Sequence, residues 1–276
     1  MESLVSTAWL ANHFGDPGLV VVDSSWHMPA SGRSGRDEFL NAHIPGARFL
    51  DVDEVADRSS PSPHMLPPAA QFGPAMEALG IGRDDRIVVY DNSPLRTAAR
   101  GWFTLRHFGA EQVAILDGGL QKWTAEGRPT ESGEPTHRNA HFAADESARV
   151  ATKQQIVAGA GCALVDARGK ARFEATEPEP RAGVAGGHIP GARNLPFGML
   201  YNQDGTLKPR EELRRLFEEA GLDPSKPFIA SCGSGVTATS LIFAAHLLGG
   251  DGGRLYDGSW TEWGSDALTP KATGPA

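Results

Sequence analysis

Cys232 lies between an expected strand and an expected helix. The apolar residues Phe228–Ser231 lead into Cys232, the glycine-rich run 233–236 follows, and an apolar stretch begins at Thr237. Glycines let backbone N–H groups turn inward, and the first turn of a helix adds the positive end of its dipole. We therefore expect Cys232 to ionise readily and to serve as a nucleophile or as the carrier of a sulfur anion.

Three other interpretations of this loop are weaker. A phosphate-binding loop of the Walker type requires a lysine and then a serine or threonine after its last glycine, whereas Val236 and Thr237 stand there. A phosphatase of the Cys-x5-Arg type requires an arginine where this chain has Ala238, so the clamp for a phosphate dianion is missing. A buried, inert core thiol is the third interpretation, and it leaves the glycine-rich turn unexplained.

The chain repeats itself, and the order of the landmarks is the same in both halves. The run 42–48, AHIPGAR, returns as GHIPGAR at 187–193, about 145 residues later. The run 116–119, LDGG, returns as YDGS at 256–259, and each copy is followed by a tryptophan. This pattern indicates a duplicated domain of roughly 130 residues and not a solenoid, whose repeats are much shorter.

Short apolar runs alternate with helical patterns in both halves. The expected buried strands are Val20–Asp23, Ile87–Tyr90, Ala114–Leu116, Leu164–Asp166, Phe228–Ser231 and Arg254–Tyr256. The expected helices are Pro94–Phe108, Pro209–Ala220 and Thr237–Leu248. Strands and helices in alternation predict the α/β class, with an open parallel sheet flanked by helices in each half.

The polar stretch 127–148 separates the two halves. It contains glycine and proline and has weak periodicity, which is typical of a linker. We expect one domain over residues 1–130, a linker over 131–150 and a second domain over 151–276. Aligning the halves puts Asp91 at the position of Cys232, and a carboxylate cannot carry a persulfide, so the first domain is expected to be catalytically silent. The last residues, 269–276, are typical of a loose tail.

Composition sets bounds on the class of protein. The 276 residues carry a formal net charge of −8, 40% are apolar and 22% are charged, which is ordinary for a globular protein and gives no basic footprint for nucleic acid. No apolar run is long enough to cross a membrane, and the start lacks the features of a signal or transit peptide, so the cytoplasm is the expected location. Two cysteines form neither a disulfide framework nor a zinc site, and no metal or organic cofactor is expected.

The run 232–238, CGSGVTA, resembles the active-site loop of the 3-mercaptopyruvate sulfurtransferases. The paired HIPGA runs and the run YDGSWTEW at 256–263 are similar to those of tandem rhodanese domains, and the resemblance covers residues 5–264. It implies two tandem rhodanese-like domains. It also implies transfer of sulfur from 3-mercaptopyruvate, through a persulfide on Cys232, to a thiol or to cyanide, with release of pyruvate; a thioredoxin-type acceptor is a family expectation.

The resemblance further implies roles for individual residues. Arg172 and Arg181 match the pair that holds the pyruvyl part of the donor, and a guanidinium suits an α-keto carboxylate. Ser234, His64 and Asp53 match a Ser–His–Asp set in which Asp53 orients His64 and His64 activates Ser234. The other substrate-binding positions are the loop residues Gly233, Gly235, Val236 and Thr237. Surface ion pairs for the arginines and a structural role for His64 remain open alternatives.

Two other functions also remain open. A thiosulfate:cyanide sulfurtransferase resembles this fold but usually has basic residues directly after its cysteine, whereas Gly233 and Ser234 are uncharged. A monoanionic donor held by arginines elsewhere therefore fits better than a dianion. A non-catalytic module that only carries a persulfide would need the cysteine but no donor-binding arginines. We expect His43 and His188 of the HIPGA runs to be structural, and Cys162 to be an ordinary thiol.

Overall fold

The computed structural model describes residues 1–159 and 161–276, which form two compact units. The first unit comprises Met1–Asp57, Leu66–Ser147 and Asn202–Leu207. The second unit comprises Arg58–Met65, Ala148–Tyr201 and Lys208–Ala276, apart from residue 160. Each unit therefore includes a short segment from the other half of the sequence, and this is how His64 comes to belong to the second unit.

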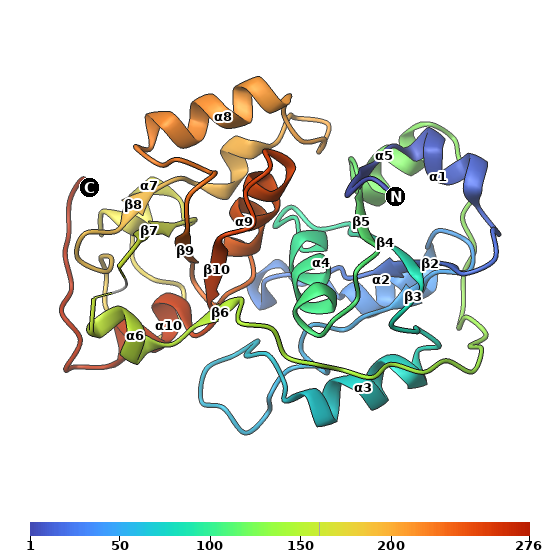
Figure 1. The fold of residues 1–276 in the computed structure, drawn as a ribbon, viewed down its shortest axis with the longest axis horizontal. Coiled ribbons are helices and arrows are strands. Elements are labelled where there is room, and N and C mark those ends of the chain that lie inside the picture. The colour runs from blue at the N-terminus through green and yellow to red at the C-terminus, as the bar shows by residue number, and fades with distance from the viewer. Residues whose placement is uncertain (160) are drawn as a thin grey trace. The chain divides into compact units, whose positions relative to one another are not determined.

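The first unit is built on a five-stranded parallel sheet with the order β1-β5-β4-β2-β3 (Figure 1). Strands β2 and β4 are buried along nearly their whole length, as expected of parallel strands between layers of helices. The strands are β1 Leu4–Val5, β2 Leu19–Asp23, β3 Arg48–Phe49, β4 Arg86–Tyr90 and β5 Val113–Leu116. The helices are α1 Thr7–His13, the 3-10 helix η1 Pro29–Ser31, α2 Gly35–Asn41, α3 Ala69–Ala78, α4 Ala98–His107 and α5 Gly119–Ala125.

The described part of the second unit repeats this plan, with the strand order β6-β10-β9-β7-β8 and parallel pairing throughout. Its central strand, β9, takes the place that β4 has in the first unit. The strands are β6 Val150–Ala151, β7 Ala163–Asp166, β8 Arg193–Asn194, β9 Phe228–Ser231 and β10 Gly253–Tyr256. The helices are α6 Lys153–Val157, α7 Lys170–Phe173, the 3-10 helix η2 Phe197–Leu200, α8 Arg210–Glu219, α9 Ala238–Leu247 and α10 Ser259–Ser265.

The two sheets confirm the predicted α/β class, and all six predicted strands are present. Helices α8 and α9 each begin one residue inside the predicted start. The prediction for α4 is wrong at its beginning, because Ser93–Arg96 form a turn closed by the bond from Arg96 N to Ser93 O (3.1 Å). Arg96 has a φ of 54°, which a right-handed helix does not contain. The helix therefore begins only at Ala98.

Residues 131–147, within the stretch expected to be a linker, pack on the first unit. Phe142 is buried, and its ring meets that of Phe72 edge-on. The carbonyl of His141 accepts a hydrogen bond from Arg83 N (3.1 Å), and Glu131 forms a β-bridge with His43. One buried aromatic ring and a few backbone hydrogen bonds thus fix a stretch whose composition is polar.

The C-terminal tail is held in the second unit, so the prediction of a loose tail is wrong. Ala272 forms an isolated β-bridge with His188, and Gly274 N donates to Glu174 O (3.0 Å). Glu174 directly follows α7, which carries Arg172. The tail therefore braces the end of that helix through backbone hydrogen bonds, which do not depend on side-chain identity and leave little trace in the sequence.

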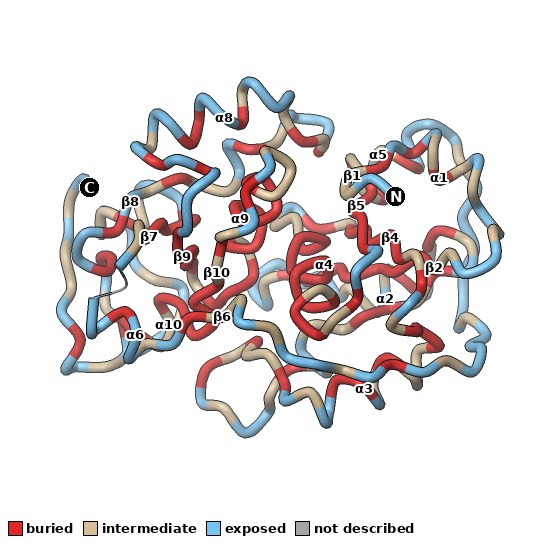
Figure 2. The backbone as a smooth tube through the Cα atoms, in the orientation of Figure 1, coloured by how far each residue is buried: buried red, intermediate tan, exposed pale blue. Residues whose placement is uncertain are grey.

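Buried residues concentrate in the strands and in helices α4 and α9 (Figure 2). Helix α9 is buried on nearly all sides, with Ala238–Ala245 all buried, as its largely apolar sequence predicts. The core of the second unit joins strand residues such as Ile229 to Trp260 and Trp263 of α10. Within residues 1–159 and 161–276, no helix is both long and apolar enough to span a membrane.

The two sheets contain equivalent buried aspartates, Asp23 and Asp166, which have different partners. In the second unit Asp166 forms an ion pair with Arg168, Oδ2 to Nη2, at 2.6 Å. In the first unit Asp23 lies beside Tyr90 on the neighbouring strand and accepts a hydrogen bond from Ser25 N (2.8 Å). Burial raises the pKa of Asp23 to about 7, although its hydrogen bonds with Ser25 act in the opposite direction.

We expect Asp23→Asn to stabilise the first unit at pH 8. The pKa of Asp23 in the folded state lies above the unfolded value of 3.8, so the wild type loses stability as the pH rises from about 4 to about 7. At 1.36 kcal/mol per pKa unit, the variant should be more stable by about 4 kcal/mol at pH 8 and by less than half of that at pH 5. Urea unfolding of both proteins at the two pH values measures this, and a difference that does not change with pH contradicts it.

Candidate active site

Cys232 lies at the carboxyl end of β9 and is 2% exposed. Its N–H donates to Ser259 Oγ (3.0 Å), and its carbonyl accepts from Trp260 N (3.0 Å). Both partners follow β10, the strand next to β9. The ends of two adjacent strands therefore fix the backbone of the candidate nucleophile, at the edge of the sheet where α/β proteins place their ligands.

Ser259 fixes Cys232 from a strained backbone conformation. Its φ is 50°, in the left-handed region, and it is fully buried. The equivalent residue of the first unit is Gly119, where an added Cβ would collide with the carbonyl oxygen of Asp91. A serine held in such a conformation, with its hydroxyl also donating to Tyr256 O (2.8 Å), indicates a positioning role. The sequence signal for it is the serine that replaces the second glycine in the second copy of the DGG motif.

The loop after Cys232 presents backbone donors without acceptors. Gly235 has a φ of 77°, which turns the loop. The N–H groups of Ser234, Val236, Thr237 and Ala238 have no hydrogen-bond acceptor among the described residues. Thr237 caps α9 without a side-chain hydrogen bond, and Val236 is buried, so both contribute through the backbone. The loop is therefore suited to bind a negative charge.

The first unit shows such a loop already filled. The carboxylate of Asp91 accepts hydrogen bonds from Ser93 N (2.9 Å) and from Ala98 N, the first residue of α4 (2.6 Å). Burial raises the pKa of Asp91, and these two hydrogen bonds oppose the shift. The equivalent donors of the second unit, at Ser234 and Ala238, remain available for a group that is not part of the chain.

Arg172 and Arg181 both approach the loop at Gly233. A Cβ placed on Gly233 would lie 3.2 Å from Nη2 of Arg172 and 3.9 Å from Nη1 of Arg181. The missing side chain thus leaves room for two guanidinium groups over the residue that follows the cysteine. Both arginines named from the sequence are therefore found at the loop, and Arg172 keeps 28% of its side chain exposed.

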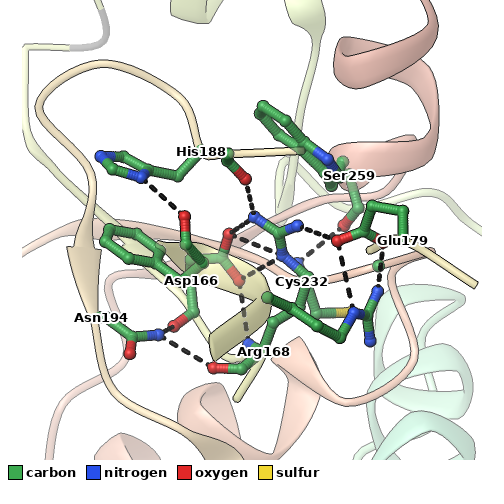
Figure 3. Close-up of polar contacts among 12 residues, drawn as sticks. Asp166, Arg168, Glu179, His188, Asn194, Cys232 and Ser259 are labelled. Atoms are coloured by element: carbon green, nitrogen blue, oxygen red, sulfur yellow. Dashed lines mark hydrogen bonds and ion pairs between the residues drawn. The ribbon is translucent and has the colours of Figure 1, made fainter. Parts of the chain in front are cut away.

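Arg172 pairs with Glu179, which belongs to a buried chain of charges with Arg168 and Asp166 (Figure 3). Glu179 accepts hydrogen bonds from Arg172 Nη2 (2.6 Å) and Nε (3.3 Å) and from Arg168 Nη1 (2.6 Å). Arg168 lies between the carboxylates of Asp166 and Glu179, and its guanidinium carbon is 4.7 Å from the centre of the Trp260 ring. Burial alone lowers the pKa of Arg168, but the two carboxylates outweigh burial and raise it. The sequence pattern assigns no role to Glu179 or Arg168.

Ser234 connects the loop to His64. Nδ1 of His64 lies 2.9 Å from Ser234 Oγ, and Arg181 Nη2 donates to the same oxygen at 3.5 Å. If the His64 ring carries its proton on Nε2, the Ser234 hydroxyl donates to Nδ1. His64 is 5% exposed and has a φ of 63°, a conformation that a histidine adopts mainly where the surrounding structure imposes it.

Asp53 belongs to the first unit, where its Oδ2 accepts a hydrogen bond from Trp26 Nε1 (2.8 Å). The structure thus brings Ser234 and His64 together, and the pairing of Asp53 with His64 stays a prediction.

The histidines of the HIPGA runs are buried, and each contacts a backbone carbonyl oxygen. His43 Nδ1 contacts Phe39 O (2.7 Å), His188 Nδ1 contacts Phe173 O (2.9 Å), and each ring stacks on the phenylalanine whose carbonyl it contacts. Cys162 is half-buried, with its sulfur 3.9 Å from Arg254 Nη2. No group of three or more metal-ligating side chains is found within residues 1–159 and 161–276.

Comparison with known proteins places both halves in one family. Residues 6–126 and 149–266 each match the rhodanese-like domain. The chain belongs to the rhodanese family. It is 42% identical over 272 residues to 3-mercaptopyruvate sulfurtransferase of Homo sapiens, covering 95% of this chain and 92% of the relative. It is 41% identical over 273 residues to thiosulfate sulfurtransferase of Bos taurus, again covering 95% and 92%.

A solved structure shares the fold over nearly the whole length of both chains. The crystal structure of SseA from Escherichia coli, described as a 3-mercaptopyruvate sulfotransferase, superposes with a TM-score of 0.86 at 38% identity. The match covers 94% of this chain and 99% of that one. The rhodanese fold of both halves is thereby confirmed.

Proposed function

We propose that this protein is a sulfurtransferase that moves sulfur from 3-mercaptopyruvate to a thiol or to cyanide through a persulfide on Cys232. Three features that lie together carry the proposal: a cysteine at a strand end, a loop with N–H groups that have no acceptor among the described residues (those of Ser234, Val236 and Thr237), and two guanidinium groups over Gly233. Relatives named for this activity span nearly the whole chain.

In the first step, the thiolate of Cys232 attacks the sulfur atom of 3-mercaptopyruvate. A sulfur–sulfur bond forms, the carbon–sulfur bond breaks, and its electron pair leaves with the pyruvyl group as an enolate. Arg172 and Arg181 hold the carboxylate and the keto oxygen, because the guanidinium fork matches these acceptors. The enolate then takes a proton and departs as pyruvate.

Ser234 is the proposed route for that proton. Its hydroxyl lies between His64 Nδ1 and Arg181 Nη2. It can pass its proton to the enolate and take one back from His64 when the imidazole is protonated on Nδ1. Asp53 is the proposed partner that orients His64 in this set.

In the second step, a thiol or cyanide attacks the outer sulfur of the persulfide and releases the Cys232 thiolate. Gly233, Gly235, Val236 and Thr237 contribute backbone to the loop that holds the sulfur anion between the two steps. A thioredoxin-type protein is the proposed macromolecular acceptor, and the cytoplasm is the proposed location. The proposed reaction involves no nucleic acid or membrane, and it uses no metal or organic cofactor. We assign the nucleophile to residues 151–276 and regard the loop of residues 1–130 as catalytically silent, because Asp91 already fills it. The first half of the sequence contributes His64 and Asp53 to the proposed set.

The absence of a side chain at Gly233 bears on which sulfur donor the site prefers. Relatives named for either donor are almost equally similar to this chain, at 42% and 41% identity, so overall similarity does not separate them. Any side chain at position 233 would crowd Arg172, and a basic one would also repel it. A loop of this kind therefore favours a monoanionic α-keto acid, and thiosulfate, a dianion, is the alternative donor.

We expect kcat/KM with 3-mercaptopyruvate to exceed that with thiosulfate by roughly tenfold or more, on the scale of one additional well-placed charged contact. Steady-state assays of the purified chain with each donor, using a reducing thiol or cyanide as acceptor, measure both values. A preference for thiosulfate would make the alternative donor correct. If the protein turned over neither donor, the remaining interpretation would be a non-catalytic module that only carries a persulfide.

A further inference from the structure

Arg172 has two edges that can each hold a carboxylate, and Glu179 occupies one of them. Nε and Nη2 of Arg172 donate to Glu179 at 3.3 and 2.6 Å. The remaining edge, Nη1 with Nη2, lies over the loop, 4.0 and 3.2 Å from the position of a Cβ on Gly233. Glu179 therefore determines which edge of Arg172 is presented beside Cys232.

Glu179 also changes the charge at the loop. Asp166, Arg168, Glu179 and Arg172 are linked by direct ion pairs, and two acids with two bases give no net charge. The side chain of Glu179 is 4% exposed, so water screens the interaction of its carboxylate with Arg172 only weakly. Arg172 thus offers hydrogen-bond donors to a bound molecule, while Glu179 cancels the positive charge that a lone arginine would bring.

We propose that Glu179 is a specificity-determining residue, which cancels the charge of Arg172 and so makes the site favour a monoanionic donor over a dianionic one. The inference rests on the proposed function, since it concerns the choice between sulfur donors. Glu179 acts through Arg172 and the local field, and it need not touch the donor itself.

The first unit offers a matched control. Glu38 is held by Arg33 through Nε (2.6 Å) and Nη2 (2.7 Å) and also contacts His27 and Asn92. It is therefore a carboxylate paired with an arginine, as Glu179 is, but in the half whose loop is filled by Asp91. Glu38→Gln makes the same chemical change in the unit that does not contain Cys232.

Glu179→Gln keeps the size of the side chain and removes one negative charge. Both donors then bind at a site with more positive charge. The favourable electrostatic interaction increases more for the dianionic donor than for the monoanionic one. We expect the ratio of kcat/KM for thiosulfate to kcat/KM for 3-mercaptopyruvate to rise roughly tenfold, the size of one additional charge interaction at an effective dielectric constant near 20. Glu38→Gln should leave the ratio unchanged. Because both values come from one sample, the ratio does not depend on the fraction of protein that is folded.

Glu179→Asp separates charge from geometry, because it keeps the charge and shortens the side chain. We expect both rates to fall but the donor ratio to stay within about threefold of the wild type, since the charge is retained. A ratio that rises as much in Glu179→Asp as in Glu179→Gln would overturn the proposal, because placement of Arg172 would then explain the preference. An unchanged ratio in Glu179→Gln would also overturn it.

Alkylation of Cys232 tests the charge without any sulfur donor. In a Cys162→Ser background, the rates with anionic iodoacetate and neutral iodoacetamide are compared by mass spectrometry of the peptide that contains Cys232. The iodoacetate-to-iodoacetamide ratio should rise severalfold in Glu179→Gln and not in Glu38→Gln. If the wild type turns over neither donor but this ratio rises, the proposed function fails while the effect of Glu179 on charge stands. If the ratio is unchanged while the wild type turns over 3-mercaptopyruvate, the proposal about Glu179 fails alone.

Discussion

Cys232→Ser lowers kcat/KM with 3-mercaptopyruvate by roughly 10⁴-fold or more, the scale on which removal of a nucleophile acts. A serine hydroxyl has nearly the size of a thiol and keeps the hydrogen bonds of the loop backbone, but it cannot accept sulfur to form a persulfide. The expected loss is therefore in kcat, and the folded structure should be unchanged. Steady-state assays and circular dichroism of the purified variant measure both properties.

Cys162→Ser is the matched control, since Cys162 is the other cysteine of the chain and its sulfur lies near Arg254, away from the glycine-rich loop. It should retain activity within about twofold, as surface and half-buried substitutions away from a site usually do. Incubation with the donor and no acceptor should add the mass of one sulfur atom to the peptide with Cys232. Sulfur found on Cys162, or turnover retained by Cys232→Ser, would contradict the assignment of the nucleophile.

Arg168→Met is expected to destabilise the second unit by about 3–5 kcal/mol, because it leaves two buried carboxylates without their cation. Arg168 is 2% exposed and binds Asp166 and Glu179 simultaneously. Urea unfolding followed by tryptophan fluorescence measures the change, since Trp260 lies against Arg168. The loss should be larger at pH 8 than at pH 5, because a buried acid without a cation has a raised pKa and costs most when it is ionised.

Arg33→Met provides the comparison for this effect. Arg33 pairs with Glu38 at 2.6 Å, but its side chain is 35% exposed, so water can replace the pair and the expected loss is below about 1 kcal/mol. A loss for Arg168→Met as small as that for Arg33→Met would show that the buried charges of the second unit do not depend on one another.

The fold could be predicted from local signals because each is contained in a short stretch. Apolar runs such as Phe228–Ser231 mark buried strands, and the duplicated HIPGA runs mark the two halves. The stretch around Phe142 and the tail near Ala272 escaped prediction, because one aromatic ring or one backbone bridge holds each of them. Such long-range contacts have no local pattern.

The site could be predicted in part. Cys232 is recognisable because it lies between a strand and a helix at the start of a glycine-rich loop. Arg172, Arg181 and His64 are identified only through resemblance to a family. His64 stands 170 residues before Ser234, and nothing in the spacing connects them. Arg168 and Glu179 could not be predicted from pattern, since charged residues in a loop are normally exposed. The surroundings of Arg168 include residues that are distant in the sequence, such as Trp260.

The loop of Asp91 shows how a loop of this fold binds a carboxyl group. A persulfide is short-lived, and an acceptor removes it. The first half, by contrast, keeps a carboxyl group in the corresponding place, bound by the backbone N–H groups of Ser93 and Ala98. The duplication has thus left within one chain a lasting example of the backbone donors that the second half is proposed to offer to a transient sulfur anion.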